Sequence, residues 1–266
     1  AVEASTDTTR PTGSLGSFAT APAYSQEGGA TPFGITDVGN TASPAFADID
    51  GDGDHDLFIG HHDGYTNFFR NTGSASAPAY TRQEGDTPFG ISDVGFSASP
   101  ALADIDGDGD LDLFIGNSYG NTLFFRNTGS ASAPAYSQEG GDTPFGIPDV
   151  ARYAIPALAD IDGDGDLDLF IGNIYGSTFF FRNTGSASAP AYTQQEGDTP
   201  FGIPDFGRTA TPAPALADID GDGDLDLFIG HYHGYTNFFR NTGSASAPAY
   251  TQEGGNTPYD GFFGIP

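Results

Sequence analysis

The 266-residue sequence has no cysteine, no methionine and no tryptophan. The absence of cysteine excludes disulfide bonds, thiol catalysis and zinc–thiolate sites. No run of apolar residues reaches the roughly 18 that a membrane-spanning helix requires, so we expect no membrane insertion. Basic residues are also scarce: lysine is missing, and 8 arginines stand against 36 acidic residues, for a net charge of −28. Such a chain repels phosphate polyanions, so nucleic acid is not an expected partner.

Glycine and aromatic residues, by contrast, are abundant. The chain has 39 glycines, 19 prolines, 23 phenylalanines and 12 tyrosines. Glycine and proline at this level predict many turns, while the aromatic content indicates a packed core and argues against disorder. A folded chain with such a surplus of carboxylates needs bound cations, and the arrangement of the aspartates supports this.

A repeat of 56 residues dominates the sequence. The motif TPFGI begins at Thr31, Thr87, Thr143 and Thr199, and an altered form, TPYDGFFGI, begins at Thr257. Three intervals are 56 residues and the last is 58, because the fourth unit has two additional residues in TATPAPALADID. Self-similarity at a fixed period indicates a repeat architecture in which each unit packs against its neighbours.

The repeats predict one domain with an incomplete unit at each end. The Asp-rich segment occurs four times, whereas APAY occurs five times. We therefore divide the chain into an N-terminal tail, 1–16, and a single repeat domain, 17–266, with complete repeats at 31–86, 87–142, 143–198 and 199–256 and partial units at 17–30 and 257–266. One of the two partial units is in excess of what four closed repeats need.

Within a unit, the segments are typical of short β-strands. Runs such as PALADI, LDLFIG, TLFFRN and PAYSQ are rich in aromatic and branched residues and are bounded by turn formers, whereas no helical periodicity is sustained. Leu113, Phe114 and Ile115 are apolar in succession, as expected of a strand covered on both faces. We predict an all-β fold, a β-propeller of four-stranded blades with one blade per repeat. A β-sandwich and a linear β-solenoid are the alternatives.

The chemistry of the repeat lies in the nonapeptide DIDGDGDxD, which runs from Asp48 to Asp56 in the first unit. Carboxylates at positions 1, 3, 5 and 9 converge if the chain turns tightly, and glycines at positions 4 and 6 permit such a turn. Ca²⁺ takes about 6–8 oxygen ligands, which this cluster can supply. The loop is not an EF-hand, because position 12 is Ile59 and not glutamate. The loops differ only at position 8, His55 against leucine, and we expect that side chain to point away from the ion.

The pattern D-x-D-x-D-G-x-x-D-L-x-I-G resembles the calcium loop of FG-GAP repeats, which occur in integrin α-subunit propellers and in bacterial VCBS-type proteins. The segments FFRNTGSASAPAY and TPFGI are similar to those of secreted bacterial members, and the resemblance covers about 17–266. It implies a β-propeller with about four Ca²⁺ ions per chain and a secreted, extracellular or cell-surface location in a bacterium. Extracellular calcium modules bind in the range of about 10⁻⁴–10⁻³ M.

Carried over by motif position, the resemblance implies a ligand set for each loop. Four aspartate side chains would bind the ion: Asp48, Asp50, Asp52 and Asp56; Asp104, Asp106, Asp108 and Asp112; Asp160, Asp162, Asp164 and Asp168; Asp218, Asp220, Asp222 and Asp226. Position 7 would contribute its backbone carbonyl: Asp54, Asp110, Asp166 and Asp224.

Two short windows vary between otherwise near-identical repeats. One follows DVG and contains Thr41, Ser97, Tyr153 and Thr209; the other follows LFIG. Aromatic and histidine side chains in the second window are candidates for binding a glycan or protein partner, and neutral variation of exposed turns is the alternative. These candidate ligand-binding residues are His61, His62, Tyr65, Tyr119, Tyr175, His231, His233 and Tyr235.

Nothing in the sequence predicts catalysis. The carboxylates are assigned to metal and no GxSxG nucleophile elbow occurs. The arginine of FFRN recurs in every unit, and we expect it to pair with carboxylates or carbonyls; these residues are Arg70, Arg126, Arg182 and Arg240. The expected function is that of a non-enzymatic extracellular calcium-binding repeat protein with a structural or adhesive role. The alternative is a calcium-dependent, lectin-like propeller that binds a glycan or partner through the variable turns.

The surplus partial unit favours self-association. A strand without a partner exposes backbone donors and acceptors, to which another chain can add. We therefore expect head-to-tail assembly, into a filament if the rotation does not close, in which a terminal segment of one chain completes a blade of the next. The alternative is a tail, or an additional strand on the edge of its own ring.

Overall fold

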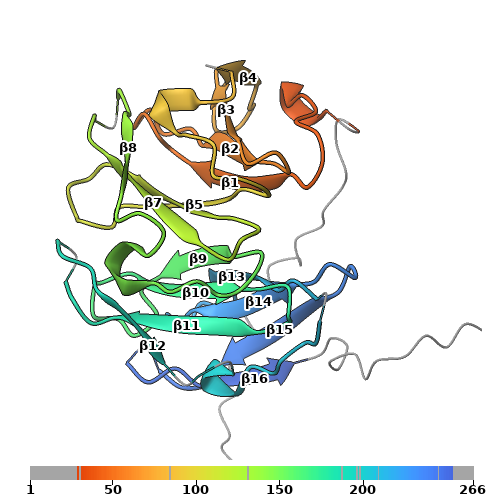
Figure 1. Cartoon of the computed structure of the whole chain (residues 1–266), viewed down its shortest axis with the longest axis vertical. Helices are drawn as coiled ribbons and strands as arrows, with labels where there is room; N and C mark the ends of the chain where they lie inside the picture. The colour runs from red at the N-terminus through yellow and green to blue at the C-terminus, as the bar shows by residue number, and fades with distance from the viewer. Residues whose placement is uncertain are drawn as a thin grey trace, which may run out of the picture.

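The computed structural model describes residues 29–253 except 30, 84, 131, 187, 196, 198, 209 and 245. These residues form four antiparallel sheets of four strands each, one from each repeat (Figure 1). The predicted all-β propeller fold is therefore confirmed. The tail 1–16, the partial unit 257–266 and, apart from Gly29, the partial unit 17–30 lie outside the described residues.

Each blade follows the same order of four strands along the chain. Blade 1 contains β1 (Ser43–Ala47), β2 (Asp56–Gly60), β3 (Thr66–Asn71) and β4 (Tyr80–Gln83); blade 2 contains β5 (Ser99–Ala103), β6 (Asp112–Gly116), β7 (Thr122–Asn127) and β8 (Tyr136–Glu139). Blade 3 contains β9 (Ile155–Ala159), β10 (Asp168–Gly172), β11 (Thr178–Asn183) and β12 (Tyr192–Gln195); blade 4 contains β13 (Ala213–Ala217), β14 (Asp226–Gly230), β15 (Thr236–Asn241) and β16 (Tyr250–Glu253).

The blades are arranged as an arc around the innermost strands (Figure 1). β1 contacts β5, β5 contacts β9, and β9 contacts β13. Among the described residues, no interface of comparable extent joins β1 to β13. Figure 1 accordingly shows blade 1, in orange, and blade 4, in blue, at the two ends of the arc.

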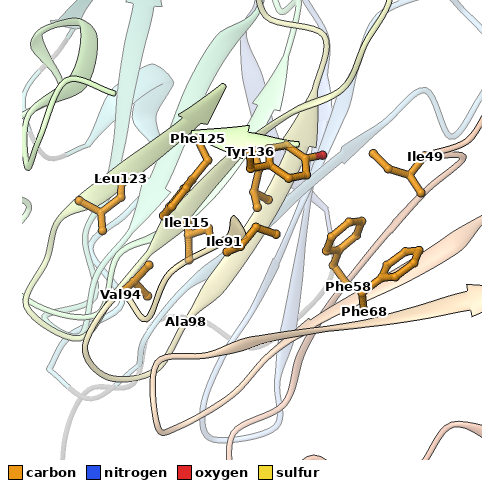
Figure 2. Close-up of a cluster of buried hydrophobic side chains, with 11 residues drawn as sticks. Ile49, Phe58, Phe68, Ile91, Val94, Ala98, Ile115, Leu123, Phe125 and Tyr136 are labelled. Atoms are coloured by element: carbon orange, nitrogen blue, oxygen red, sulfur yellow. The ribbon is translucent and has the colours of Figure 1, made fainter. Parts of the chain in front are cut away.

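Successive side chains of a strand point to opposite faces of the sheet, so a strand of consecutive apolar residues makes both faces apolar. We call the side that faces the following blade the forward face and the side that faces the preceding blade the rear face. At the first junction, the forward face of blade 1 (Ile49, Phe58 and Phe68) packs on the rear face of blade 2, which includes Leu113 and Ile115 (Figure 2). The alternation in the middle strand, with Phe114 in the next cluster, confirms that this strand is covered on both faces.

The TPFGI motif forms one 3₁₀ turn per repeat: Pro32–Gly34, Pro88–Gly90, Pro144–Gly146 and Pro200–Gly202. In each turn the phenylalanine has a left-handed backbone, for example φ 53° at Phe89. This conformation directs the ring into the junction, where Phe89 lies 4.8 Å from Phe68 and 6.5 Å from Phe58 between ring centroids. The turn therefore adds to the contact between successive blades.

No helix within the described part of the chain is long and apolar enough to span a membrane.

Candidate metal centre

An Asp-rich loop joins the first and second strands of every blade. In each loop, carboxylate oxygens from positions 1, 3 and 5 lie within 4.8 Å of one another. The four clusters are Asp48, Asp50 and Asp52; Asp104, Asp106 and Asp108; Asp160, Asp162 and Asp164; and Asp218, Asp220 and Asp222. The structure thus brings together three of the four side chains predicted for each ion.

The glycines at positions 4 and 6 give the loop its curvature. In the first loop, Gly51 and Gly53 have φ values of 71° and 92°, a region that side chains disfavour. The carboxylate of Asp48 also organises the turn, since it accepts a hydrogen bond from the amide of Asp52 at 3.1 Å and from that of Gly53 at 3.0 Å. The chain therefore wraps around the first carboxylate.

The aspartate at position 9 is buried at the start of the second strand. Oδ1 of Asp56 accepts a hydrogen bond from the amide of Asn71 at 2.6 Å, which fixes the side chain, whereas Oδ2 is buried without a partner. Asp112 and Asp168 repeat this arrangement, and each likewise has an unpartnered Oδ2. A buried carboxylate oxygen without a hydrogen bond is costly, so a cation at this point would satisfy it.

The electrostatics of position 9 link it to the rest of the loop. Burial, together with the neighbouring charges of Asp52 and Asp48, raises the pKa of Asp56 to about 6. Burial likewise raises the pKa of Asp112 to about 6 and that of Asp168 to about 7. The fourth predicted carboxylate of each of these loops therefore senses the field of the other carboxylates, and a bound cation would reverse this repulsion.

One arginine neutralises part of each loop. The FFRN arginine, from the third strand, forms an ion pair through Nη1 with Oδ2 of the aspartate at position 3. The pairs are Arg70–Asp50, Arg126–Asp106, Arg182–Asp162 and Arg240–Asp220. The expected pairing of these arginines with carboxylates is confirmed, and it leaves the other oxygen of each carboxylate for the loop interior.

The tyrosine of APAY supports the loop in a way that the sequence did not indicate. The Tyr80 hydroxyl donates to the carbonyl of His55 at 3.0 Å, and the equivalent Tyr136 donates to Leu111 at 2.9 Å. The outermost strand of a blade is thereby tied to position 8 of its own loop. Position 8 faces the blade junction, since Leu111 packs against the first cluster, as expected of a side chain that points away from an ion.

The donor set fits a hard cation. Each loop offers carboxylate oxygens only, with no sulfur or imidazole among the converging atoms. Such a set suits Ca²⁺ better than zinc or copper, which prefer nitrogen or sulfur ligands. Residues at positions 1, 3, 5 and 9 would hold the ion. The side chain of Asp54, at position 7, is not part of the cluster, which leaves its backbone carbonyl as the predicted contribution.

A model of the FG-GAP-like repeat matches three overlapping stretches, residues 48–115, 104–171 and 160–229. Together these stretches span more than half of the chain. The chain belongs to the FG-GAP-like repeat family. Each matched stretch begins at the first aspartate of one loop and ends in the strand that follows the next loop, so the matches coincide with successive junctions.

Solved structures offer only a distant likeness to this FG-GAP-like repeat protein, and no curated protein matches it in sequence. An Agrocybe aegerita lectin that recognises non-reducing terminal N-acetylglucosamine is 20% identical, with a TM-score of 0.48, over 80% of this chain and 52% of its own. A BBS1N–ARL6DN complex is 12% identical, with a TM-score of 0.40, over 80% of this chain and 56% of the other. The chain thus spans about half the length of these two proteins.

The candidate ligand-binding turns of the FG-GAP-like repeats each follow the second strand of a blade. His61 is buried, with its ring 5.9 Å from that of Tyr65, and His231 packs edge-on against Phe206 at 4.3 Å. His62 and Tyr119 both contact the ring of Phe96, at 5.8 and 6.2 Å between ring centroids. Tyr175 lies in the turn of blade 3, and His233 and Tyr235 lie in that of blade 4. Two of the histidines therefore have packing roles that the sequence did not distinguish from ligand binding.

A cavity of about 420 Å³ lies instead beside the innermost strands of all four blades. Its lining includes Thr41, Ser97 and Tyr153, from the variable window after DVG, together with Thr211 and Tyr232. The first four of these residues have left-handed backbones, with φ between 47° and 55°. Non-glycine residues adopt this conformation at a cost, and such positions occur often at functional sites.

Proposed function

We propose that this protein is a non-enzymatic, extracellular calcium-binding module in which one Ca²⁺ ion stabilises each of the four blades. The observation that carries the proposal is the repeated combination of three converging carboxylates with a buried fourth, whose Oδ2 lacks a partner in three loops. A bound ion would satisfy these oxygens and offset the mutual repulsion of the loop charges.

The ions have a structural role in this proposal. Each loop connects the innermost strand to the second strand. The isoleucine at position 2 of the first three loops and the leucine at position 8 of the last three pack into blade junctions. An ion that fixes the loop therefore also fixes the junction. Binding in the range of about 10⁻⁴–10⁻³ M matches extracellular calcium, which supports a secreted or cell-surface location and a structural or adhesive role.

Calcium removal tests this proposal. The metal content of the purified chain would be measured after dialysis against millimolar Ca²⁺, and thermal unfolding would be followed with Ca²⁺, Mg²⁺ or EDTA. We expect four ions per chain. At millimolar Ca²⁺, a site with a Kd of about 10⁻⁴ M contributes about 1.4 kcal/mol, so four sites contribute about 6 kcal/mol. A difference of 1 kcal/mol corresponds to about 2–4 °C in a domain of this size. Chelation should therefore lower Tm by at least ~10 °C, with Ca²⁺ restoring it better than Mg²⁺. An unchanged melting curve under full chelation contradicts the proposal.

A second candidate function is lectin-like binding, which the cavity beside the innermost strands favours. Its lining combines hydroxyl groups with the exposed ring of Tyr232, the mixture of polar and aromatic groups that suits a sugar. A glycan array in Ca²⁺ buffer, with Tyr153→Ala as the matched variant, tests this function. Binding that persists in the variant would place the glycan site outside the cavity, and no binding to any glycan would argue against the lectin-like function.

A further inference from the structure

The three junctions between blades use the same contacts. In each, the isoleucine at position 2 of a loop and two phenylalanines of the forward face are covered by the next blade; at the first junction these are Ile49, Phe58 and Phe68. A backbone hydrogen bond accompanies the apolar contact at each junction. The bonds run from Val94 N to Gly64 O at 3.0 Å, from Val150 N to Gly120 O at 3.0 Å and from Phe206 N to Gly176 O at 2.9 Å.

The forward face of blade 4 has the same side chains but no covering blade among the described residues. Ile219 is 57% exposed, whereas its counterparts Ile49, Ile105 and Ile161 are 1–2% exposed. Phe228 and Phe238 are partly exposed, in contrast to the fully buried phenylalanines of the other forward faces.

The rear face of blade 1 is open in part: Leu57, Ile59 and Phe69 are buried in a cluster against which Ile35 and Val38 pack, whereas the outer side chains of this face are exposed. Phe33 and Phe46 are 47% and 56% exposed. Ile35 and Val38 are partly exposed, although their counterparts in blade 2, Ile91 and Val94, are buried. The two ends of the arc therefore carry the two halves of one more junction.

Backbone groups at the two ends match as well. Gly234 O and Val38 N occupy the positions of the acceptor and donor in the three junction bonds, and no such backbone bond is formed by either within the described residues. Glycine also ends the second strand of every blade. A Cβ at Gly60 would overlap the carbonyl of Ala98 in the next blade, whereas a Cβ at Gly230 would have only Ala213 O, at 4.0 Å, as its nearest neighbour.

We propose that a second copy of this chain docks on these ends, so that the forward face of blade 4 of one copy packs on the rear face of blade 1 of the other. The new junction repeats the three internal ones, including a hydrogen bond from Val38 N to Gly234 O. Two copies joined in this way at both ends form a closed ring of eight blades, within the range of about 4–8 blades found in propellers. Each described blade already has four strands, so docking uses blade faces and needs no exchanged strand.

The mass of the full chain in solution tests the proposal. Light scattering at millimolar Ca²⁺ should give twice the chain mass of 27.5 kDa. The variant Gly230→Val adds a side chain that the single chain accommodates but that would overlap the docked copy. It should keep the circular dichroism and the cooperative thermal unfolding of a folded propeller while its mass halves. Ser137→Val, which adds a similar side chain on the exposed outer strand β8, should retain the mass of two chains.

Cysteine cross-linking tests the geometry, because the chain has no cysteine of its own. At the first junction, the Oγ atoms of Ser43 and Ser99 lie 3.1 Å apart. Ala213 is the counterpart of Ser99 in blade 4, so Ser43→Cys/Ala213→Cys should oxidise to a covalent pair of chains. Neither single variant should form this product.

Three outcomes would overturn the proposal. A parent chain with the mass of one copy is the first, and a Gly230→Val variant that still has the mass of two is the second. The third is an internal disulfide in the double-cysteine variant, which would show that one chain closes on itself. Should the full chain be monomeric and a chain ending at residue 253 be dimeric, the forward face would belong to the chain's own segment 254–266. These measurements are separate from the ion count, so failure of the assembly leaves the calcium proposal standing, and the reverse.

Discussion

Blade 2 and blade 4 have nearly the same sequence but very different surroundings. Both contain the loop DIDGDGDLD and the strand DLFIG. In blade 2, Ile105, Phe114 and Phe124 are buried by blade 3, whereas Ile219 in blade 4 is exposed. The aspartates of the two loops differ too, since positions 1 and 3 are partly buried in blade 2 and exposed in blade 4. A repeat therefore determines its own strands and loop, while the following repeat determines how deeply they are buried.

This difference means that identical side chains contribute unequally to stability. Substitutions at equivalent positions of blade 2 and blade 4 should therefore differ in their effect on the free energy of unfolding. A second copy would cover the forward face of blade 4. The variants of blade 4 are therefore compared in the Gly230→Val background, in which this face should stay exposed.

The largest difference is expected from the forward-face phenylalanines. Phe124→Ala opens a cavity at a closed junction and should lower the free energy of unfolding by about 3–5 kcal/mol. Phe238→Ala removes a partly exposed ring and should cost less than half as much, because less apolar area leaves contact. Urea unfolding of both variants measures the difference. Equal losses of unfolding free energy in the Gly230→Val background would contradict this expectation. A larger loss for Phe238→Ala in the parent chain would indicate that a second copy covers the ring there.

Loss of one loop ligand should remove one ion from either blade. Asp108→Ala and Asp222→Ala should each bind three ions where the parent binds four, because the loops are separate clusters. The loss of a site held at about tenfold its Kd costs about 1–2 kcal/mol, and the cost should be larger in blade 2, where the loop supports a closed junction. Ion counting and thermal unfolding in Ca²⁺ check both points. Loss of all four ions from one substitution would show that the sites are coupled.

The metal-free protein should be more stable at pH 5 than at pH 8. Burial raises the folded-state pKa of Asp112 to about 6 and that of Asp168 to about 7, above the value of about 4 for an unfolded aspartate. Their contribution is therefore fully present below about pH 4 and is lost as pH rises through 6–7. In Ca²⁺ the trend should reverse, because protons compete with the ion for the carboxylate. Thermal unfolding at both pH values, in EDTA and in Ca²⁺, measures this, and a metal-free Tm that rises with pH contradicts it.

The smallest difference is expected at the tyrosines that support the loops. Tyr136→Phe removes the hydrogen bond to Leu111 O and should cost about 0.5–1.5 kcal/mol. Tyr250→Phe removes the same bond in blade 4, where the tyrosine is less buried, and should cost less because water can replace the hydroxyl. Chemical unfolding of the two variants in the Gly230→Val background compares them. A larger cost at Tyr250 would contradict the explanation.

The sequence predicted the blades and the loops well, because both depend on short-range patterns. The uninterrupted apolar run in LDLFIG predicted a strand covered on both faces, and the aspartate and glycine spacing predicted the loop curvature. The role of Tyr136 in supporting the loop was missed. In every blade, the equivalent tyrosine lies 25 positions after the residue whose carbonyl accepts its hydrogen bond. Only a constant spacing between APAY and the loop indicated this contact, and spacing alone does not distinguish support from neutral repetition.

The variable windows show where sequence patterns were insufficient. Histidines and tyrosines in the second window were candidate ligand-binding residues, yet His61 and His231 are engaged in packing. The cavity beside the innermost strands is lined by Ile174 and Tyr232 from the second window. It is also lined by three residues of the first window, Thr41, Ser97 and Tyr153, whose residue types gave little chemical signal. Their left-handed backbones, as at Thr41 and Ser97, are a property of the fold that residue type does not predict.

The order of strands in each sheet is the order of strands in the chain. Every sheet therefore forms from neighbouring hairpins, without waiting for a distant segment, and short-range contacts of this kind favour fast folding. As the chain leaves the ribosome, blade 1 can assemble first and serve as a template on which blade 2 condenses, and so on to blade 4. Such folding would be sequential and directional, with nearest-neighbour coupling like that of a linear array, and the last blade would be the first to fray.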